Sequence, residues 1–343
     1  MKKIVGIIGA AAVLASSIFA ADVAGQLKLG AKLYDSESKS ILTTPASSGW
    51  DDNNTYFKLS ATTDIAGAEM HFSAEDATYY NYSLWFKPID ALKVTAGNVS
   101  VSSIAKGTFA WWATTAKFES DFGGGNKCDG FKFDITVDNL SFTFLSAKTA
   151  LLNFSNEGYA VLGDFWLDGK FGLGDYGTIQ VAATKGATIN AYGVGGWETA
   201  GLAFLVAYDH MPWQQTGFYA DVLVNLADAK AFEGVSSQIG GQYVADGLAI
   251  RLTNMIAFGQ HYGDGENHFD YGFVAKASYA IDAFTPYIQL LGNEIMSKKC
   301  GLEVGCDTNV GACAINVAFT TTLNFNEGST FSFAIPVYLS VGL

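Results

Sequence analysis

The side chains best spaced for catalysis lie in one short alternating segment. Glu69, His71, Ser73 and Glu75 would all share one face of an extended strand. A hydrolase needs its serine and histidine within hydrogen-bond distance, whereas residues two apart on a strand lie roughly 7 Å apart. The chain also carries no nucleophile-elbow, zinc-protease, dinucleotide or phosphate-loop motif on a suitable element. We therefore expect these residues to line a wall, and we do not expect an enzyme.

The four cysteines form the second group with chemical potential: Cys128, Cys300, Cys306 and Cys313. They contain no Cys-x-x-Cys pair, and no histidine lies near the last three, so the spacing does not favour a metal site. Four cysteines allow three disulfide pairings, which the sequence alone leaves open. Cys300 and Cys306 flank a short glycine-containing stretch, and we expect that pair first. We expect no metal and no other cofactor.

Charged side chains recur at every second position of many segments, between apolar residues. In residues 26–33, for example, Lys28 and Lys32 alternate with leucine and alanine. Side chains two apart share one face of a strand, so charged rows would line one surface and apolar rows the other. A wide barrel with a charged interior holds water, and water conducts ions and small solutes. The predicted pore-wall residues are Lys28, Lys32, Lys58, Lys87, Glu69, Glu75 and Arg251.

The two-residue alternation continues from one end of the chain to the other. It is clear in residues 26–33, 57–62, 69–75, 80–87, 131–138, 219–226, 272–279 and 315–325. Ten residues at ~3.3 Å each, tilted by ~40°, rise ~25 Å, which matches the apolar band of an outer-membrane barrel. The strands of a soluble β-sandwich, the alternative, average about five or six residues. The pattern therefore predicts an all-β fold, a transmembrane antiparallel β-barrel.

Turn residues and longer polar stretches separate the alternating segments. Tight turns are predicted at Asp138-Asn139 and Asp246-Gly247. Longer loops are predicted at residues 35–54, 99–130, 210–217, 259–268 and 293–310. Short turns at one end and long external loops at the other are typical of outer-membrane barrels. In a count of about eighteen strands, the alternation of long and short connections fails after about Ala227, so we expect about 16 to 18 strands.

The N-terminus has the three parts of a signal peptide. Lys2 and Lys3 precede an apolar run at residues 4–15, and small residues follow as far as Ala21. The apolar run is too short to span a bilayer as a helix. We expect cleavage after Ala20, which makes residues 1–20 a signal peptide and residues 21–343 a single barrel domain.

Composition narrows the class of partner. The chain has 33 acidic against 20 basic side chains, a formal net charge of −13, which argues against binding to nucleic acid. Apolar residues make up 49% of the chain, yet no later stretch approaches the roughly eighteen consecutive apolar residues of a membrane helix. A chain this apolar without helical spans is consistent with a barrel that buries one face in lipid.

The long polar stretch at residues 99–130 contains Glu119 and then Asp121-Phe122-Gly123-Gly124. This segment resembles the third loop of general bacterial porins, which follows the fifth strand, folds inward and carries an acidic-Phe-Gly-Gly motif at the constriction. The resemblance implies that Glu119 and Asp121 narrow the pore opposite Lys28, Lys32, Lys58 or Lys87. The chain departs from those porins in one respect, because it lacks their arginine cluster on the basic side of the constriction. An ordinary glycine-rich surface loop is the alternative.

The C-terminal segment alternates apolar residues from Phe331 to the last residue, Leu343. Here the sequence resembles bacterial outer-membrane barrels, whose final strand is read by the barrel assembly machinery, although Leu343 replaces the usual terminal phenylalanine. The leader, residues 1–9, and the Phe19-Ala20-Ala21-Asp22 junction also resemble porin-like surface proteins of spirochaetes. These resemblances imply the outer membrane of a Gram-negative bacterium or a spirochaete, contact with outer-membrane lipid, and by analogy a homo-oligomer such as a trimer.

Together these observations predict an outer-membrane channel, a porin, for passive diffusion of ions and small hydrophilic solutes. A surface adhesin or antigen is one alternative, because loops such as residues 35–54 are rich in Ser, Thr, Asn and Asp. A transporter of apolar solutes is another. It would need an N-terminal plug, whereas residues 22–33 have the pattern of a strand.

Overall fold

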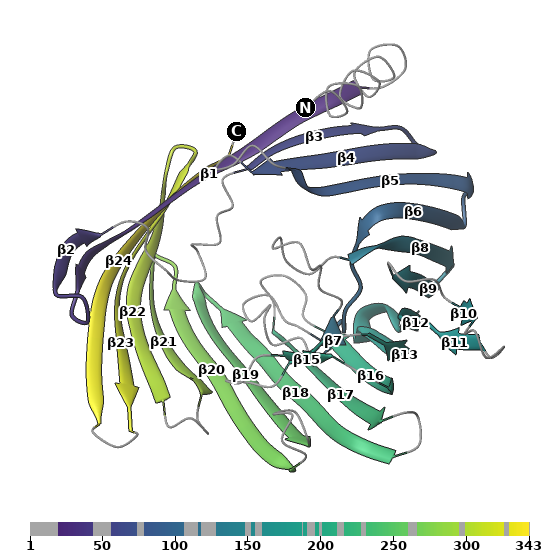
Figure 1. Ribbon diagram of the computed structural model, residues 1–343. Helices are drawn as coiled ribbons and strands as arrows, with labels where there is room; N and C mark the ends of the chain where they lie inside the picture. Colours follow the sequence, from purple (N-terminus) through teal and green to yellow (C-terminus); the bar gives the residue numbers. More distant parts are fainter. Residues whose placement is uncertain are drawn as a thin grey trace.

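The computed structural model describes residues 20–43, 56–73, 79–105, 116–117, 128–147, 152–154, 160–186, 188–190, 196–198, 201–210, 216–227, 231–259, 266–294, 299–325 and 329–342. Nearly all of these residues lie in antiparallel strands (Figure 1). The predicted signal peptide, residues 1–20, lies outside the described residues except for Ala20, and it stays a prediction. No helix in the described part of the chain is long and apolar enough to cross a membrane.

The main sheet contains nineteen strands in the described residues. Its first nine long strands are β1 (Ala20–Asp35), β3 (Tyr56–Thr62), β4 (Ala66–Ser73), β5 (Tyr79–Ile89), β6 (Leu92–Val99), β8 (Cys128–Val137), β9 (Leu140–Ala147), β12 (Phe165–Gly172) and β13 (Thr178–Lys185). The next nine are β16 (Leu202–His210), β17 (Gly217–Ala227), β18 (Ala231–Ala245), β19 (Leu248–Gly259), β20 (His268–Tyr279), β21 (Phe284–Glu294), β22 (Lys299–Val310), β23 (Cys313–Asn324) and β24 (Thr330–Gly342). The nineteenth, β2 (Ser40–Thr43), pairs with the end of β1.

β2 is a short addition to β1. The other eighteen strands of the sheet form one series, in which each strand is hydrogen-bonded to the next long strand along the chain. The pairing returns to its start because β1 contacts both β24 and β3. The barrel class and the upper value of the predicted strand number are therefore confirmed. Figure 1 shows these strands arranged side by side around one ring.

The seam of the ring lies along β1. Residues 26–35 of β1 pair with β24, whereas residues 20–26 pair with β3. The two neighbours therefore join successive parts of one strand, and they do not flank it along its whole length. The register with β24 also shifts between Lys32 and Asp35, next to Pro336. Proline has no backbone N–H to donate, so an irregular position in the ladder suits it.

The connections fall on two ends of the barrel in strict alternation. The end that holds the first described residue of β1 and the last of β24 also carries the turns at residues 90–91, 138–139, 246–247 and 311–312. The opposite end carries the long connections, including residues 100–127 between β6 and β8. The expected break after Ala227 is wrong: the sides continue to alternate, but residues 228–230 make a short connection at the long-loop end.

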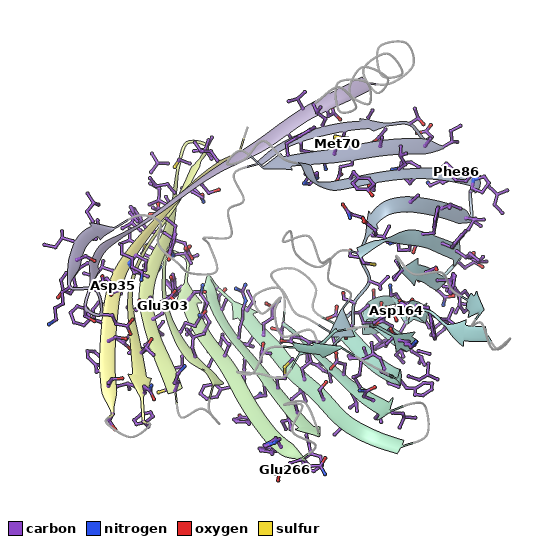
Figure 2. The ribbon with its side chains drawn as sticks, viewed as in Figure 1. Asp35, Met70, Phe86, Asp164, Glu266 and Glu303 are labelled. Carbon is purple, nitrogen blue, oxygen red and sulfur yellow. The ribbon has the colours of Figure 1, made fainter. Side chains whose placement is uncertain are left out.

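Burial in this fold is inverted relative to a soluble protein. Many large apolar side chains are exposed on the outside, such as Phe131 (57% exposed) and Val206 (57%), while polar side chains on the other row are buried, such as Gln180 (0%) and Asp221 (2%). Phe86 points away from the ring (Figure 2). Contiguous apolar patches larger than a few hundred Å² are rare on soluble monomers. The alternation therefore separates an apolar outer face from a polar inner face.

In the described part of the chain, five further short strands lie outside the main sheet. β10 (Leu152–Phe154) pairs with β11 (Ala160–Leu162), while β14 (Thr188–Asn190) pairs with β7 (Ala116–Lys117) and β15 (Gly196–Glu198). All five belong to connections at the long-loop end. A single turn of 3-10 helix, Gly174–Tyr176, joins β12 to β13 at the opposite end.

Candidate functional site: the barrel lumen

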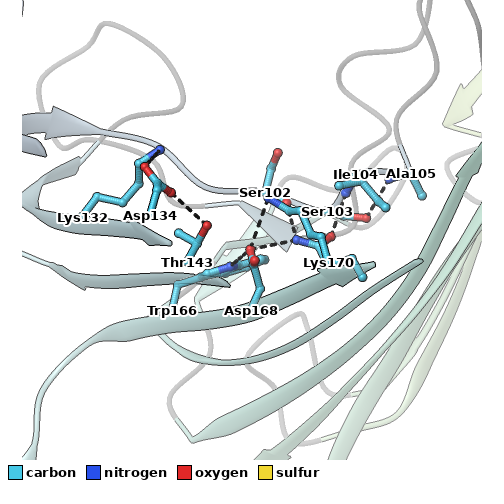
Figure 3. A network of polar contacts seen from close by, with 11 residues as sticks. Ser102, Ser103, Ile104, Ala105, Lys132, Asp134, Thr143, Trp166, Asp168 and Lys170 are labelled. Carbon is cyan, nitrogen blue, oxygen red and sulfur yellow. Dashed lines mark hydrogen bonds and ion pairs between the residues drawn. The ribbon is translucent and has the colours of Figure 1, made fainter. Parts of the chain in front are cut away.

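The chain that leaves the fifth ring strand, β6, turns into the lumen and contacts the wall. Gln180, on the inner row of β13, accepts a hydrogen bond from the backbone N–H of Ile104 (2.9 Å) and donates one to the carbonyl of Ser102 (3.3 Å). The Gln180 amide also donates to Asp168 Oδ2 (3.0 Å), which in turn accepts from Trp166 Nε1 (2.7 Å). Figure 3 shows this network. Residues 102–104 are thereby attached to β12 and β13.

A second buried carboxylate holds the same segment. Ser103 Oγ donates to Asp221 Oδ2 on β17, and Ala105 N donates back to Ser103 Oγ (3.2 Å). The side-chain amide of Gln238 on β18 donates to the same Asp221 oxygen (2.9 Å). Hydrogen bonds to a charged acceptor are stronger than those between neutral groups, and burial removes the competing water. Asp221 therefore anchors the loop to the wall that faces it.

Strand pairing attaches the same connection at a second place. In residues 100–127, β7 pairs with β14 of the β13–β16 connection through Lys117↔Thr188 and Ala116↔Ile189. Figure 1 draws β7 and β15 inside the outline of the ring. The described parts of this connection, residues 100–105 and 116–117, are therefore attached to the wall and to the β13–β16 connection, and the rest of the predicted inward-folded loop stays a prediction. Its predicted constriction residues, Glu119 and Asp121, lie outside the described residues and stay a prediction.

The wall formed by β3 and β4 carries a charged cluster. Lys58 Nζ lies 2.5 Å from Glu69 Oε2, and His71 Nε2 lies 2.7 Å from Glu69 Oε1. The pairing of Lys58 with His71 and of Ser60 with Glu69 places these side chains on one face of two adjacent strands. Glu69 therefore bridges a lysine and a histidine. Glu69, His71 and Ser73 do share one strand as expected, within β4.

Next to this cluster, two lysine ammonium groups lie close to the indole ring of Trp85 on β5. Lys93 Nζ lies 4.6 Å and Lys87 Nζ 5.9 Å from the centre of the indole. Farther along the wall, Lys132 Nζ is 3.2 Å from Asp134 Oδ2, and Asp134 also accepts a hydrogen bond from Thr143 Oγ1 (2.9 Å) (Figure 3). This side of the lumen is therefore rich in lysine.

The wall from β18 to β23 carries a second charged row at one level. Direct cross-strand partners follow one another across six strands in the order Gln242, Arg251, Lys276, Gln289, Glu303 and Thr320. Arg251 Nε donates to Gln242 Oε1 (3.1 Å). Lys276 Nζ lies 3.9 Å from the centre of the Tyr287 ring and 4.0 Å from Asp307 Oδ2. The row therefore changes from basic to acidic along the wall.

Each predicted wall residue has a definite position where the structure describes it. Lys58, Glu69 and Arg251 belong to the two wall clusters above. Lys32 forms an ion pair with Asp35 of its own strand (2.7 Å), and Lys87 lies beside Trp85. The backbone of Lys28 pairs with Ser340, while its side chain and all of Glu75 lie outside the described residues. Only part of the predicted set thus gathers into clusters.

The expected disulfide between Cys300 and Cys306 is wrong. Both residues lie on β22, and all four cysteines are free. Six residues of extended strand span roughly 20 Å, while disulfide-bonded Cα atoms lie about 5.5 Å apart. The expected loop at residues 293–310 is also wrong over residues 299–310, because these form β22. Among the described residues, no group of His, Cys, Asp or Glu side chains is arranged to hold a metal ion.

Sequence reasoning missed the residues that fasten the loop. Gln180 is polar between Ile179 and Val181, so alternation alone places it on the inner row. Nothing local, however, shows that its partners are Ser102 and Ile104. Trp85 lies between Leu84 and Phe86, so alternation places it on the inner row, but nothing local shows that it contacts two lysines.

These features define a porin-type barrel: an apolar outer face, a polar inner face and an inward loop tied to the wall. In structure the chain is similar to OprD of Pseudomonas aeruginosa, with a TM-score of 0.54, 9% identity, and coverage of 94% of this chain and 95% of OprD. It is also similar to OpdQ of the same organism, with a TM-score of 0.54, 8% identity, and coverage of 95% of this chain and 97% of OpdQ. For OmpT, an outer membrane protein of Vibrio cholerae, the TM-score is 0.50 and the identity 13%, with coverage of 94% of this chain and 97% of OmpT.

No protein-family model and no curated protein sequence matches the chain. The structural neighbours are outer-membrane porins, so the resemblance to that class is confirmed at the level of the fold. The resemblance to spirochaete surface proteins stays a prediction.

Proposed function

We propose that this protein is an outer-membrane channel through which ions and small hydrophilic solutes diffuse passively. The observation that carries the proposal is the inverted burial of the barrel, with apolar rows outside and Gln180, Asp221 and the charged wall clusters inside. Such an outer face suits lipid, and such an inner face holds water. The fold shared with outer-membrane porins supports the same conclusion.

The attached loop supplies the constriction in this proposal. Residues 102–105 lie against β12, β13 and β17, so the connection that contains Glu119 and Asp121 starts inside the lumen. These two acidic residues would oppose lysines of the wall, of which Lys32, Lys58 and Lys87 have described side chains. A fixed arrangement of opposite charges across a narrow passage selects solutes by charge as well as by size.

The proposed membrane environment and partners of the protein are inferred mainly from the apolar outer face of the barrel. The outer apolar rows would contact outer-membrane lipid, and β24 would be read by the barrel assembly machinery during insertion. We also propose a homo-oligomer, by analogy with trimeric porins. The signal peptide at residues 1–20 would direct export to the outer membrane of a Gram-negative bacterium or a spirochaete.

The alternative transporter of apolar solutes has less support, because it would need an N-terminal plug, whereas residues 22–33 are part of β1 in the ring. Catalysis is not part of the proposal, since the wall histidine His71 binds Glu69 on its own strand.

The test of the function is conductance of the refolded protein in a planar lipid bilayer. Discrete, stable current steps in potassium chloride are expected, and the reversal potential in a salt gradient will report the preferred ion. A preparation that is rich in β-structure and inserted in the membrane, but gives no current steps, would refute the diffusion channel.

A further inference from the structure

The inner wall has a small polar cavity where β3, β4, β5, β6 and β8 adjoin. Its volume is about 240 Å³, and its lining includes Glu69, Trp85, Lys93, Thr95 and Lys132 together with the hydroxyls of Ser60, Ser83 and Ser100. Trp85, Thr95 and Lys132 are direct cross-strand partners in succession, so they form one row on the lumen side. Solute-binding cavities in proteins are usually larger, about 300 Å³ or more, so this one suits a small ligand.

Two lysines line the cavity: Lys132 is paired with Asp134, whereas Lys93 has no acidic partner among the described residues. The Lys93 ammonium lies over the indole of Trp85 at 4.6 Å, and among the described residues no carboxylate lies within ion-pair distance of it. Its cross-strand partner Asp134 instead binds Lys132 and Thr143. An aromatic face attracts a cation but carries no net charge, so Lys93 keeps its full positive charge for an anion. Glu69 is engaged by Lys58 at 2.5 Å.

A second, independent observation points to a ligand. Thr95 is only 8% exposed and lines the cavity, yet its hydroxyl oxygen has no hydrogen-bond partner in the part of the chain that the structure describes. Burying a hydroxyl without a partner costs about 1–3 kcal/mol, so such groups are rare unless water or a ligand completes them. The free hydroxyl and the free ammonium are two residues apart on the same inner row of β6.

We propose that this cavity is a binding site for a small polyhydroxylated organic anion, such as a sugar acid. Its anionic group would lie between the ammonium groups of Lys93 and Lys132. Its hydroxyls would pair with Thr95 and the serine hydroxyls, and one of them would donate to Glu69. The inference deepens the proposed channel function, because it names a class of solute for the same lumen.

The test is isothermal titration calorimetry on the full-length folded protein in detergent micelles, with gluconate as the probe. Sorbitol, a neutral polyol, and hexanoate, an anion without hydroxyls, are the comparison ligands. We expect a millimolar dissociation constant for gluconate and at least about tenfold weaker binding of the other two, because each lacks half of the required groups.

Two substitutions locate the site. Lys93→Gln is expected to weaken gluconate binding about tenfold, and Thr95→Val, which keeps the side-chain shape, about threefold to tenfold. Lys87→Gln is the matched control: it removes the same charge beside the same indole, but Lys87 is not part of the cavity lining. Gluconate binding should change less than twofold in that variant.

Three results would overturn the site: no gluconate binding, equal affinity for gluconate and hexanoate, or an equal loss from Lys87→Gln and Lys93→Gln. Conductance of the same preparation is measured separately. Gluconate binding by a protein that conducts no ions would uphold the site and refute the channel. Conductance without gluconate binding would uphold the channel and refute the site.

Discussion

The ring of Tyr287 on β21 lies flat over Gly305, its direct cross-strand partner on β22. A Cβ atom added at Gly305 would fall 2.6 Å from both Cζ and Oη of the tyrosine. The flat ring carries Lys276 on one face, and its hydroxyl donates to Glu303 Oε1 (2.5 Å) and accepts from Asn316 Nδ2 (2.9 Å). Because Gly305 has no side chain, the Tyr287 ring can lie against the wall and contact the charged residues of this row.

The same arrangement occurs twice more on the inner wall. Trp85 covers its cross-strand partner Gly67, and Tyr219 covers Gly240. An aromatic side chain that covers a glycine on the neighbouring strand protects a weak point of the sheet. In a channel it also keeps a large ring against the wall instead of across the lumen.

Gly305→Ala should displace the Tyr287 ring and break its contacts with Glu303, Asn316 and Lys276. We expect a loss of about 1–3 kcal/mol in the free energy of unfolding, which is typical of overpacking, together with a lower single-channel conductance as the ring moves into the lumen. Gly172→Ala is the control, because a Cβ there meets its nearest atom at an ordinary 3.6 Å. Equal effects from both substitutions would show that the Tyr287 contact does not matter.

Asp221→Ala should release the loop at residues 102–105, because Ser103 and Gln238 lose their charged acceptor. Charge-assisted hydrogen bonds contribute about 1.5–3 kcal/mol, so protease cleavage within residues 106–127 should accelerate on the order of tenfold. Open-channel current noise should also increase. Asp90→Ala removes the same charge from an exposed turn and should leave both readouts as in the wild type. A loop that stays equally resistant without Asp221 would contradict the anchoring role.

All four cysteines should be free thiols in the folded protein, because none is paired and Cys300 and Cys306 are too far apart on β22. Alkylation after denaturation without reductant, followed by mass spectrometry, should therefore add four adducts. The same reaction after reduction is the control and should give the same mass. Two adducts without reductant and four with it would reveal a disulfide that this fold excludes for Cys300 and Cys306.

Glu69→Gln should shift the channel toward anions. Lys58 would lose its carboxylate partner, so the wall gains one uncompensated positive charge, and the cation-to-anion permeability ratio should fall by about a factor of two. Lys58→Gln should shift the ratio in the opposite direction. Reversal potentials in a salt gradient measure both, with Glu37→Gln in the exposed β1–β2 turn as the control. Shifts of the same sign from the two wall variants would place this cluster outside the conduction path.

Much of the fold was predictable because the decisive signal is local. A side-chain period of two residues assigns each residue of a strand to the inner or the outer face, which is how Gln180 and Asp221 share the inner surface with Arg251. The limits arise where glycine has a packing role. Gly301 and Gly305 resemble loop residues in the sequence, but they lie within β22, and Gly305 is there because Tyr287 occupies its side-chain space.

The site was harder to predict, because its contacts join distant parts of the chain. The hydrogen bond from Ser103 to Asp221 spans 118 residues, and the one from Ile104 to Gln180 spans 76. No local pattern specifies such pairs. The motif at Glu119 and Asp121 lies in the connection after the fifth strand, but the described anchors are at the beginning of that connection, where the sequence shows only small polar and apolar residues.

The alternation of inner and outer rows around an aqueous lumen is the central claim, and substituted-cysteine block tests it most directly. In a background without native cysteines, a cysteine is placed at the inner Gln289 or at its outer neighbour Leu290, which is 48% exposed on the apolar face. A charged, water-soluble methanethiosulfonate is then added to single channels in a bilayer. The account predicts a stepwise loss of current for Gln289→Cys and none for Leu290→Cys. Equal block of both, or block of Leu290→Cys alone, would contradict it.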